Sequence, residues 1–435
     1  MALPIAVSML AQFALQLVDL YFVTRLGVSA TAGVNAAGNV IFVTIAVSQV
    51  LGIGTVVLIA HGVGRRDYAD VRIVLHQCLS LALFCGLVAV AVILAFVGPY
   101  LELISPDRLT FDAGMTFIAW ALPGYALTFP MAVLGSALRG AGKPVHAAAL
   151  SIFIVLLNAA LAPLFIAEEA AGWGVKGAGL ATSVSVLAGF TLCLLYCART
   201  QRWMRLQYEL MWPRYQHWGR ILRVGIPAGC DFGMHFLFTA IVYYAIRDFG
   251  VVAQAGYAMG SQVLQMVALP GMAIAYAAGP IAGQNFGARN AARVTETFRK
   301  TAALAVAVMA VAIVVIQWQP GLLLGLLDAD LEAIAAASEF LRAASWALAA
   351  QVLVSVCSGM FQAMAYTVPS VVSSSVRLVT FAVPTFWLYF QSSLEIEHVW
   401  HLYVVSLGIQ AVLSLWLVTA EFRRRLPQPG VVISH

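Results

Sequence analysis

Twelve long apolar segments run through the sequence and set the class of fold that it can adopt. A helix needs about 20 apolar residues to cross a bilayer, and only structures that satisfy their own backbone hydrogen bonds are stable in lipid. The sequence therefore predicts an all-α integral membrane protein with twelve transmembrane helices. We place these helices at residues 3–24, 31–62, 71–98, 110–138, 144–166, 174–198, 219–247, 254–285, 295–318, 332–364, 368–391 and 398–422.

The composition agrees with a polytopic membrane protein. Of the 435 residues, 62% are hydrophobic and 10% are charged, whereas about 25% of the residues of a soluble domain are charged. We expect no removable signal peptide, because Met1-Ala2-Leu3-Pro4 enters the first span without a basic segment. The six cysteines lie in apolar segments, which predicts neither a disulfide framework nor a metal site.

Charged residues alternate between the loops at the two ends of the predicted helices. Most Lys and Arg residues fall within 65–72, 139–143, 199–223, 289–300 and 423–425, whereas the intervening loops are acidic. The positive-inside rule then places both termini in the cytoplasm. We expect a multi-pass protein of the inner (plasma) membrane, in contact with the lipid bilayer, whose net charge of +5 reflects topology rather than a nucleic-acid partner.

The sequence also contains an internal repeat. A shift of 223 residues aligns Pro4 with Pro227 and Gly27 with Gly250, and Trp120-Ala121-Leu122 aligns with Trp346-Ala347-Leu348 after a three-residue slip. Each copy holds six spans, an even number, so both copies begin on the same side of the membrane. This pattern predicts two parallel repeats related by a pseudo-two-fold axis along the membrane normal.

The repeat divides the chain into four parts. We predict an N-terminal six-helix lobe over 1–198, a cytoplasmic connector over 199–218, a C-terminal six-helix lobe over 219–425 and a cytoplasmic tail over 426–435. The stretch from 199 to 223 mixes Arg with Trp, which favours an amphipathic helix at the membrane surface.

The first span carries a polar stripe that ends in a carboxylate. Ser8, Gln12, Gln16 and Asp19 are spaced by four, four and three residues, which places them on one face of a helix. A charge inside a membrane helix costs a few kcal/mol and normally faces protein or water. We expect the stripe to line a transport cavity and Asp19 to carry the coupling proton or cation. The alternative is a buried Asp19 that only ties helices together.

In the second copy, the stripe positions are occupied by Asp231, His235 and Thr239, again on one helical face. Asp231 and His235 are four residues apart and can pair across one helical turn. A histidine that titrates near neutral pH suits proton transfer, so the two residues are candidates for a second-lobe proton site. A self-neutralising structural pair explains the same residues, and both interpretations stay open.

Taken together, several motifs resemble those of the multidrug and toxic compound extrusion (MATE) transporters, over essentially the whole chain. In the second half, GMFQAMAYTVPS (359–370) and Arg377 are similar to the bacterial DinF-like branch. The other motifs are LVDLYFVTRLG (17–27), AHGVGRRDYADVR (60–72), GSALRGAGKP (135–144), LLNAALAPLFI (156–166), GWGVKGAGLATSVS (172–185), VGIPAG (224–229) and GPIAGQNFGARN (279–290).

The resemblance implies a cation site in the first lobe. It maps the family's coupling residues onto Asp19, Asn158 and Thr182, and the proline associated with bending of the first helix onto Pro4. Ala162 stands where many members have a second aspartate. Losing a carboxylate weakens the case for Na⁺, although Na⁺ at Asp19, Asn158 and Thr182 remains an alternative to the proton.

The second lobe departs further from the family's pattern. The carboxylates of the other branch fall at His235 and near Gln351. Neither carboxylate is retained, so we expect no second-lobe sodium site.

The implied function is secondary active efflux, in which amphiphilic and often cationic organic compounds leave in exchange for protons or Na⁺. Gln12, Gln16 and Asn158 are the residues that we expect to line the substrate cavity. Alternating access between the two lobes would move the substrate. We expect a monomer with no cofactor besides the coupling ion, no enzymatic activity and a small organic molecule as its substrate.

Three other classes of protein share some of these features. A major-facilitator transporter also has two six-helix halves but has a different charge pattern and would not supply WGVKGAGLAT after the fifth span. A flippase for lipids or lipid-linked saccharides would be expected to place several cations in its cavity, and only Arg377 is available. An enzyme needs a constellation such as paired carboxylates or a nucleophile with its base, and Asp231/His235 is the sole pair.

Overall fold

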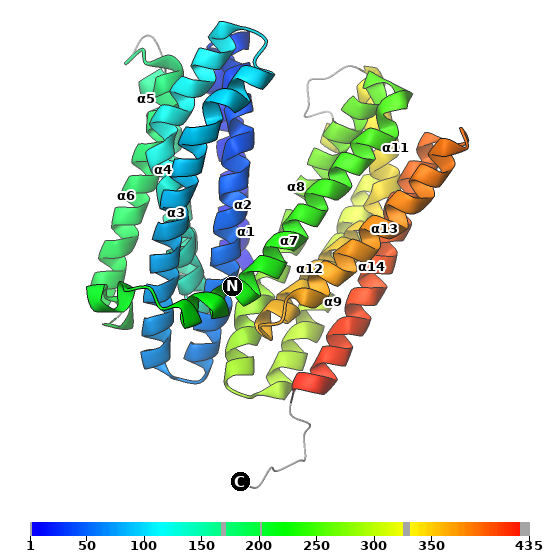
Figure 1. The fold of residues 1–435 in the computed structure, drawn as a ribbon. Coiled ribbons are helices and arrows are strands. Elements are labelled where there is room, and N and C mark those ends of the chain that lie inside the picture. Colours follow the sequence, from blue (N-terminus) through cyan, green and yellow to red (C-terminus); the bar gives the residue numbers. More distant parts are fainter. Residues whose placement is uncertain (1, 167–170, 201, 325–330, 427–435) are drawn as a thin grey trace. The chain divides into compact units, whose positions relative to one another are not determined.

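The computed structural model describes residues 2–166, 171–200, 202–324 and 331–426, and every regular element within them is helical (Figure 1). Along the first helix the side chains of residues 12, 13 and 15–20 lie outside the description. The all-α prediction is confirmed.

The six helices of the first half begin and end close to their predicted limits. Each coincides with an apolar run, because burying the backbone in lipid requires a continuous hydrogen-bonded helix. They are α1 (Ala2–Thr24), α2 (Val28–Gly64), α3 (Tyr68–Ile104), α4 (Arg108–Gly140), α5 (Pro144–Ile166) and α6 (Gly174–Thr200).

The second half follows the same order with two additions. The η3 turn (Arg247–Phe249) follows the first helix of this half, and a short α10 (Pro320–Leu324) follows the third. Within the described residues, ten helices are long and apolar enough to cross a membrane, or eleven when one bent pair counts as a single span. The helices are α7 (Tyr215–Ile246), α8 (Val251–Gly287), α9 (Ala291–Trp318), α11 (Leu331–Ser345), α12 (Leu348–Ala363), α13 (Val368–Phe390) and α14 (Ile396–Arg425).

The helix boundaries confirm the internal repeat. Adding 223 to the limits of α2 gives the limits of α8, and adding it to α4 gives the start of α11 and the end of α12. Gly27 and Gly250 precede α2 and α8 with φ values of 102° and 91°. Only glycine adopts this backbone conformation without strain. The shared glycine therefore fixes the same turn in both copies.

The turns after α2 and α8 are also duplicated. Arg66 and Arg289 both adopt positive φ, at 59° and 57°. Asp67 then caps α3 by accepting from the backbone N–H of Asp70, and Asn290 caps α9 by accepting from Arg293. Both side chains satisfy a helix N-terminal donor that otherwise lacks a partner.

The predicted tenth span is broken rather than continuous. α11 and α12 meet at a 55° bend. At the break, Gln317 of α9 donates its side-chain amide to the carbonyl of Arg342 at 2.7 Å and to Ser345 Oγ at 3.0 Å. An inserted side chain that takes over a ladder carbonyl is a recognised cause of a kink.

The connector does not form the amphipathic helix expected from its Arg and Trp residues. Between α6 and α7, the described residues 202–214 form two short 3₁₀ turns, η1 (Arg202–Met204) and η2 (Tyr208–Met211). Gln77 of α3, fully buried, donates to the carbonyls of Leu210 and Trp212 at 2.6 and 2.8 Å and accepts from the N–H of Arg214 at 2.8 Å. Because these backbone groups form hydrogen bonds with Gln77 of α3, they are not available for the hydrogen bonds of the expected amphipathic helix.

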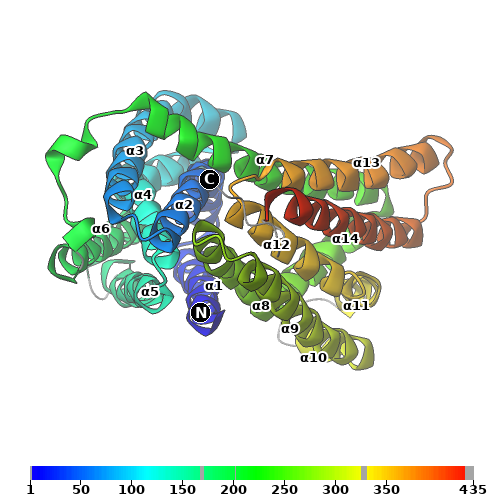
Figure 2. The same cartoon turned by 90° about the horizontal axis from the view of Figure 1, so that it is seen from below.

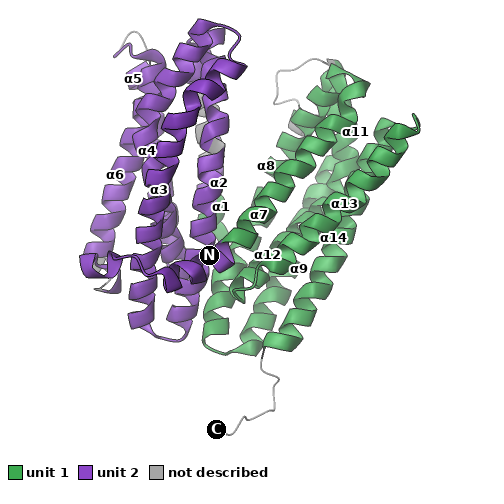
Figure 3. Ribbon diagram, viewed as in Figure 1, with its two compact units in different colours: residues 1–6, 226–435 green, residues 7–225 purple. Residues whose placement is uncertain are grey.

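The chain separates into two compact units (Figure 3). Unit 2 holds residues 7–225, so the connector and the start of α7 belong to it, and unit 1 holds 1–6 and 226–435. This division differs from the predicted lobe limits at 198 and 219. In unit 2, α4 packs against α2, α3 and α6. In unit 1, α8 packs against α9, α11 and α12, and α13 lies beside α14 (Figures 1 and 2).

Candidate functional site

The predicted site residues of the first half come from α1, α5 and α6. The structure brings two of them together, since Asn158 Nδ2 donates to Thr182 Oγ1 at 3.3 Å. Thr182 in turn donates to the carbonyl of Ala178 at 3.2 Å, one turn earlier on α6. Asn158 is 3% exposed, and its Oδ1 has no hydrogen-bond partner in the described part of the chain. The pair therefore offers a free oxygen acceptor inside unit 2.

The side chains of Gln12, Gln16 and Asp19 lie outside the described residues. Their backbone belongs to α1, and Val23, one turn after Asp19, is buried. Val23 shares a buried apolar cluster with Ala162 of α5 and Ala178 of α6, called the apolar cluster below. Ala162 is 1% exposed, so a methyl group in apolar packing occupies the position where related chains carry a second acid.

Pro4 lies in the first turn of α1, which begins at Ala2. Its counterpart Pro227 lies inside α7, where the ring removes a backbone hydrogen bond.

In unit 1, Asp231 and His235 do not form the pair that their spacing allows. No ion pair joins them, although both side chains are described. The Asp231 carboxylate instead accepts a hydrogen bond from the hydroxyl of Ser374 on α13, and His235 is exposed. The hydroxyl satisfies the carboxylate directly, so the carboxylate turns toward α13 rather than along α7.

Two further residues complete this polar chain and were missed from the sequence. Gln410 of α14 donates its amide to Ser374 Oγ at 3.0 Å, so three helices contribute to one network. Ser374 and Gln410 are polar residues inside apolar spans, and this contrast is the only feature of the sequence that points to them.

Arg377 is buried against aromatic rings. Its guanidinium lies 3.9 Å from the centre of the Phe238 ring and 5.4 Å from that of Tyr403. The residue is 7% exposed, and within the described residues no carboxylate lies within ion-pairing distance of it. It therefore neither snorkels to the membrane surface nor pairs with an acid, and cation–π contact stabilises its charge.

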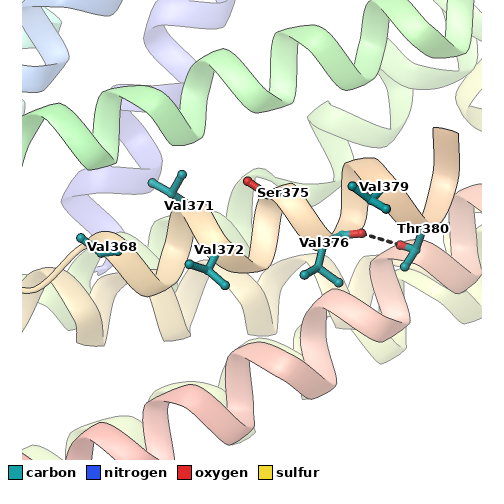
Figure 4. A pocket seen from close by; sticks show the side chains of 7 residues that line it. All are labelled: Val368, Val371, Val372, Ser375, Val376, Val379 and Thr380. Atoms are coloured by element: carbon teal, nitrogen blue, oxygen red, sulfur yellow. Dashed lines mark hydrogen bonds between the residues drawn. The ribbon is translucent and has the colours of Figure 1, made fainter. Parts of the chain in front are cut away.

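A pocket of about 360 Å³ follows the opposite face of α13 (Figure 4). Figure 4 shows Ser375 as its one polar residue besides Thr380, whose hydroxyl donates to the carbonyl of Val376 at 2.8 Å. Such a lining suits apolar groups only. The residues that line it are Val368, Val371, Val372, Ser375, Val376, Val379 and Thr380.

Comparison with known sequences identifies the family. The sequence profile of the MatE family matches residues 4–164 and 227–388, one match in each half. The chain belongs to the MatE family. Members of this family are transporters and not enzymes, which confirms that part of the prediction. The two matches also coincide with the two copies of the internal repeat.

Curated relatives match over most of the chain at low identity. A probable multidrug resistance protein, YoeA of Bacillus subtilis, is 25% identical over 307 residues, which are 68% of this chain and 65% of that protein. This chain thus spans slightly less than two thirds of that relative's length. A probable multidrug resistance protein NorM of Pseudomonas aeruginosa is 27% identical over 79% of this chain and 72% of its own. A protein of Shewanella oneidensis that is 22% identical over 66% of this chain and 64% of its own is named an FAD transporter.

Solved structures share the fold. A crystal structure of MATE in complex with MaD3S superposes with a TM-score of 0.90 at 20% identity, covering 97% of this chain and 95% of that one. An outward-facing multidrug resistance MATE family transporter gives a TM-score of 0.86 at 21% identity, covering 97% and 94%. At such identities the likeness establishes the fold alone.

Proposed function

We propose that this MatE-family chain is a secondary active exporter that releases amphiphilic, often cationic, organic compounds in exchange for protons. It acts from the inner membrane as a monomer with both termini in the cytoplasm. Relatives named as multidrug resistance proteins support the substrate class. The second-half motif at 359–370 supports placing the chain in the DinF-like branch.

The observation that carries the proposal is the apolar cluster that α1, α5 and α6 share, which predicts one level for three polar residues. Asp19 lies four residues before Val23 in α1 and Asn158 four residues before Ala162 in α5, whereas Thr182 lies four residues after Ala178 in α6. α1 and α5 cross the membrane in one direction and α6 in the opposite one, so each polar residue lies one turn from its own cluster member toward the same membrane face. We assign proton uptake to Asp19, with Asn158 and Thr182 as its polar neighbours.

The residues around this level favour a proton over Na⁺. A sodium ion needs several oxygen ligands, and the buried methyl group of Ala162 supplies none. Asn158 offers one free oxygen, which suffices to accept a hydrogen bond from a protonated carboxyl group.

The proposed cycle has two states. In the cytoplasm-open state, ionised Asp19 holds a cationic compound together with Gln12, Gln16 and Asn158. A proton arriving from outside neutralises Asp19, which removes the attraction and releases the compound. Bending of α1 near Pro4 accompanies release, and alternating access of the two halves completes the exchange.

Transport in everted vesicles tests the coupling. Wild-type protein should export a fluorescent organic cation when a pH gradient is imposed and should not respond to a Na⁺ gradient. Asp19→Asn should lose pH-driven transport while reaching the membrane in the same amount, whereas His235→Ala, whose side chain forms no ion pair, should transport as wild type. Full pH-driven activity in Asp19→Asn, or a requirement for Na⁺, would refute the proposal.

A further inference from the structure

A hydrogen-bonded chain crosses three helices of unit 1. The Gln410 amide donates to Ser374 Oγ at 3.0 Å, and the Ser374 hydroxyl donates to Oδ1 of Asp231. A serine has one hydrogen to donate, so the direction of each bond in this arrangement is fixed and Asp231 is the final acceptor. The chain links α14 through α13 to α7.

The same chain has unused acceptors at its other end. Gln410 is 3% exposed, and its Oε1 has no hydrogen-bond partner in the part of the chain that the structure describes. Ser414, one turn further along α14 and 1% exposed, has an unpartnered hydroxyl. Unpartnered buried polar atoms cost free energy unless another state of the protein uses them.

Protonation of Asp231 supplies that second state. A protonated carboxyl group donates to Ser374, whose own hydrogen then needs a new acceptor. A half-turn of the Gln410 amide exchanges Nε2 for Oε1 at the Ser374 hydroxyl, so both hydrogen bonds reverse and the rest of the chain stays in place. One added proton thus reverses the direction of the chain without breaking its contacts.

A metal ion fits this chain poorly. The Asp231 carboxylate already accepts a hydrogen bond from the Ser374 hydroxyl. The described residues contain no group of three His, Cys, Asp or Glu side chains that could hold a metal. The oxygens of Asp231, Ser374 and Gln410 remain ligands for Na⁺, so the exclusion of Na⁺ rests on the charge of Arg377.

Arg377 adds a fixed positive charge beside the carboxylate. It lies three residues after Ser374 on α13, and its charge interacts with that of Asp231 through space although the two form no ion pair. Phe238 and Tyr403 hold the guanidinium in place. A mobile cation near Asp231 is repelled by this charge, and the repulsion is strong where water is excluded.

The titratable groups whose charges interact with Asp231 or Arg377 lie on α7, α8, α13 and α14. They are His235 on α7 and Tyr257 and Tyr276 on α8, together with Arg377 on α13 and Tyr403 on α14. None of them is a carboxylate, so Asp231 is the one acid in the group.

We propose that Asp231, Ser374 and Gln410 form a second proton-binding site, located in the second half of the chain, from which Arg377 excludes metal cations. Asp231 binds the proton, and Ser374 and Gln410 are positioning residues. The inference deepens the proposed function, because it names the proton as the ion that the second half binds, but binding can be measured without transport.

Infrared difference spectra of the purified full-length protein between alkaline and acid buffer test the site. The C=O band of a protonated carboxyl group should appear on acidification and should vanish in Asp231→Asn but not in Asp248→Asn, which alters an exposed acid in η3, just after α7. Ser374→Ala should move that band, because its hydrogen-bond partner is gone. Ser375→Ala, which alters the apolar pocket instead, should leave it in place.

Addition of NaCl to the same samples tests the role of Arg377. In wild type, the C=O band assigned to Asp231 should have the same position and intensity in NaCl as in choline chloride at the same concentration. In Arg377→Gln the apparent affinity for Na⁺ should rise at least about tenfold, because a like charge nearby is removed. Arg377→Lys keeps the charge and should remain insensitive.

Three results would overturn the inference. They are a band that persists in Asp231→Asn, a wild-type band that Na⁺ displaces, and an Arg377→Gln variant that stays insensitive to Na⁺. If Asp231→Asn does not fold, the pair of Ser374→Ala and Ser375→Ala decides whether the band belongs to this chain. None of these infrared measurements depends on Asp19. A result that refutes the second proton site is therefore distinct from a vesicle result that refutes proton-coupled export.

Discussion

At the scale of single residues, both proposed proton sites are built from polar side chains within the apolar helices. The meeting of Asn158 with Thr182 was predictable, because a family resemblance assigned both to one site. Ser374 and Gln410 were not predictable, since their contacts join different helices and no spacing within one helix predicts them. Asp231 and His235 do not use the pairing that their spacing allows, because helical spacing indicates which pairs can meet, and not which competing partner a neighbouring helix supplies.

Thr182 provides a test at this scale. Thr182→Val removes the hydroxyl that accepts from Asn158, leaving the buried amide without that partner. Leaving a buried polar group without its partner costs about 1–3 kcal/mol, so pH-driven efflux should fall about tenfold or more. Initial rates of dye efflux in vesicles, normalised to the amount of protein, measure the effect.

Thr191→Val is the matched control on the same helix. Its hydroxyl makes the same bond to the carbonyl four residues earlier as Thr182 does, but it is exposed and contacts no other site residue. Equal losses in the two variants would show that Thr182 contributes only to its helix.

At the scale of elements, the sequence predicted most helices to within a few residues, because the bilayer imposes a minimum apolar length. It missed the break between α11 and α12 and the 3₁₀ turns of the connector. Both depend on side chains of other helices, Gln317 and Gln77, that bond to backbone groups. An apolar pattern contains no information about such distant partners.

The duplicated turns before α2 and α8 give a prediction at this scale. Gly27→Ala and Gly250→Ala should each lower the unfolding free energy by about 1–3 kcal/mol, because alanine is strained at these positive φ values. Thermal unfolding in detergent should show similar decreases for the two variants and nearly additive ones for the double variant.

Gly38→Ala is the control, since a Cβ there meets nothing within 4 Å and the residue lies inside α2. It should be neutral or stabilising, as expected for alanine in a helix. If Gly250→Ala behaves like Gly38→Ala while Gly27→Ala does not, the two turns are not equivalent and the structural repeat is weaker than its helix limits indicate.

At the scale of the whole molecule, one six-helix plan is used twice with different polar residues. The first half carries Asp19 with Asn158 and Thr182, and the second carries Asp231 with Ser374 and Gln410. The sequence was sufficient to predict this duplication and the membrane class. It did not indicate that the second half has its own polar chain with a buried arginine beside it.

The central claim is that Asp19 exchanges a proton for substrate, and proton flux in liposomes measures it most directly. Purified protein is reconstituted with a pH-sensitive dye inside, and a gradient of substrate is applied without any pH gradient. Wild type should move protons against the flow of substrate, whereas Asp19→Asn, which lacks both the proton acceptor and the charge that holds the substrate, should move neither. Proton flux in Asp19→Asn equal to that of wild type would contradict the account.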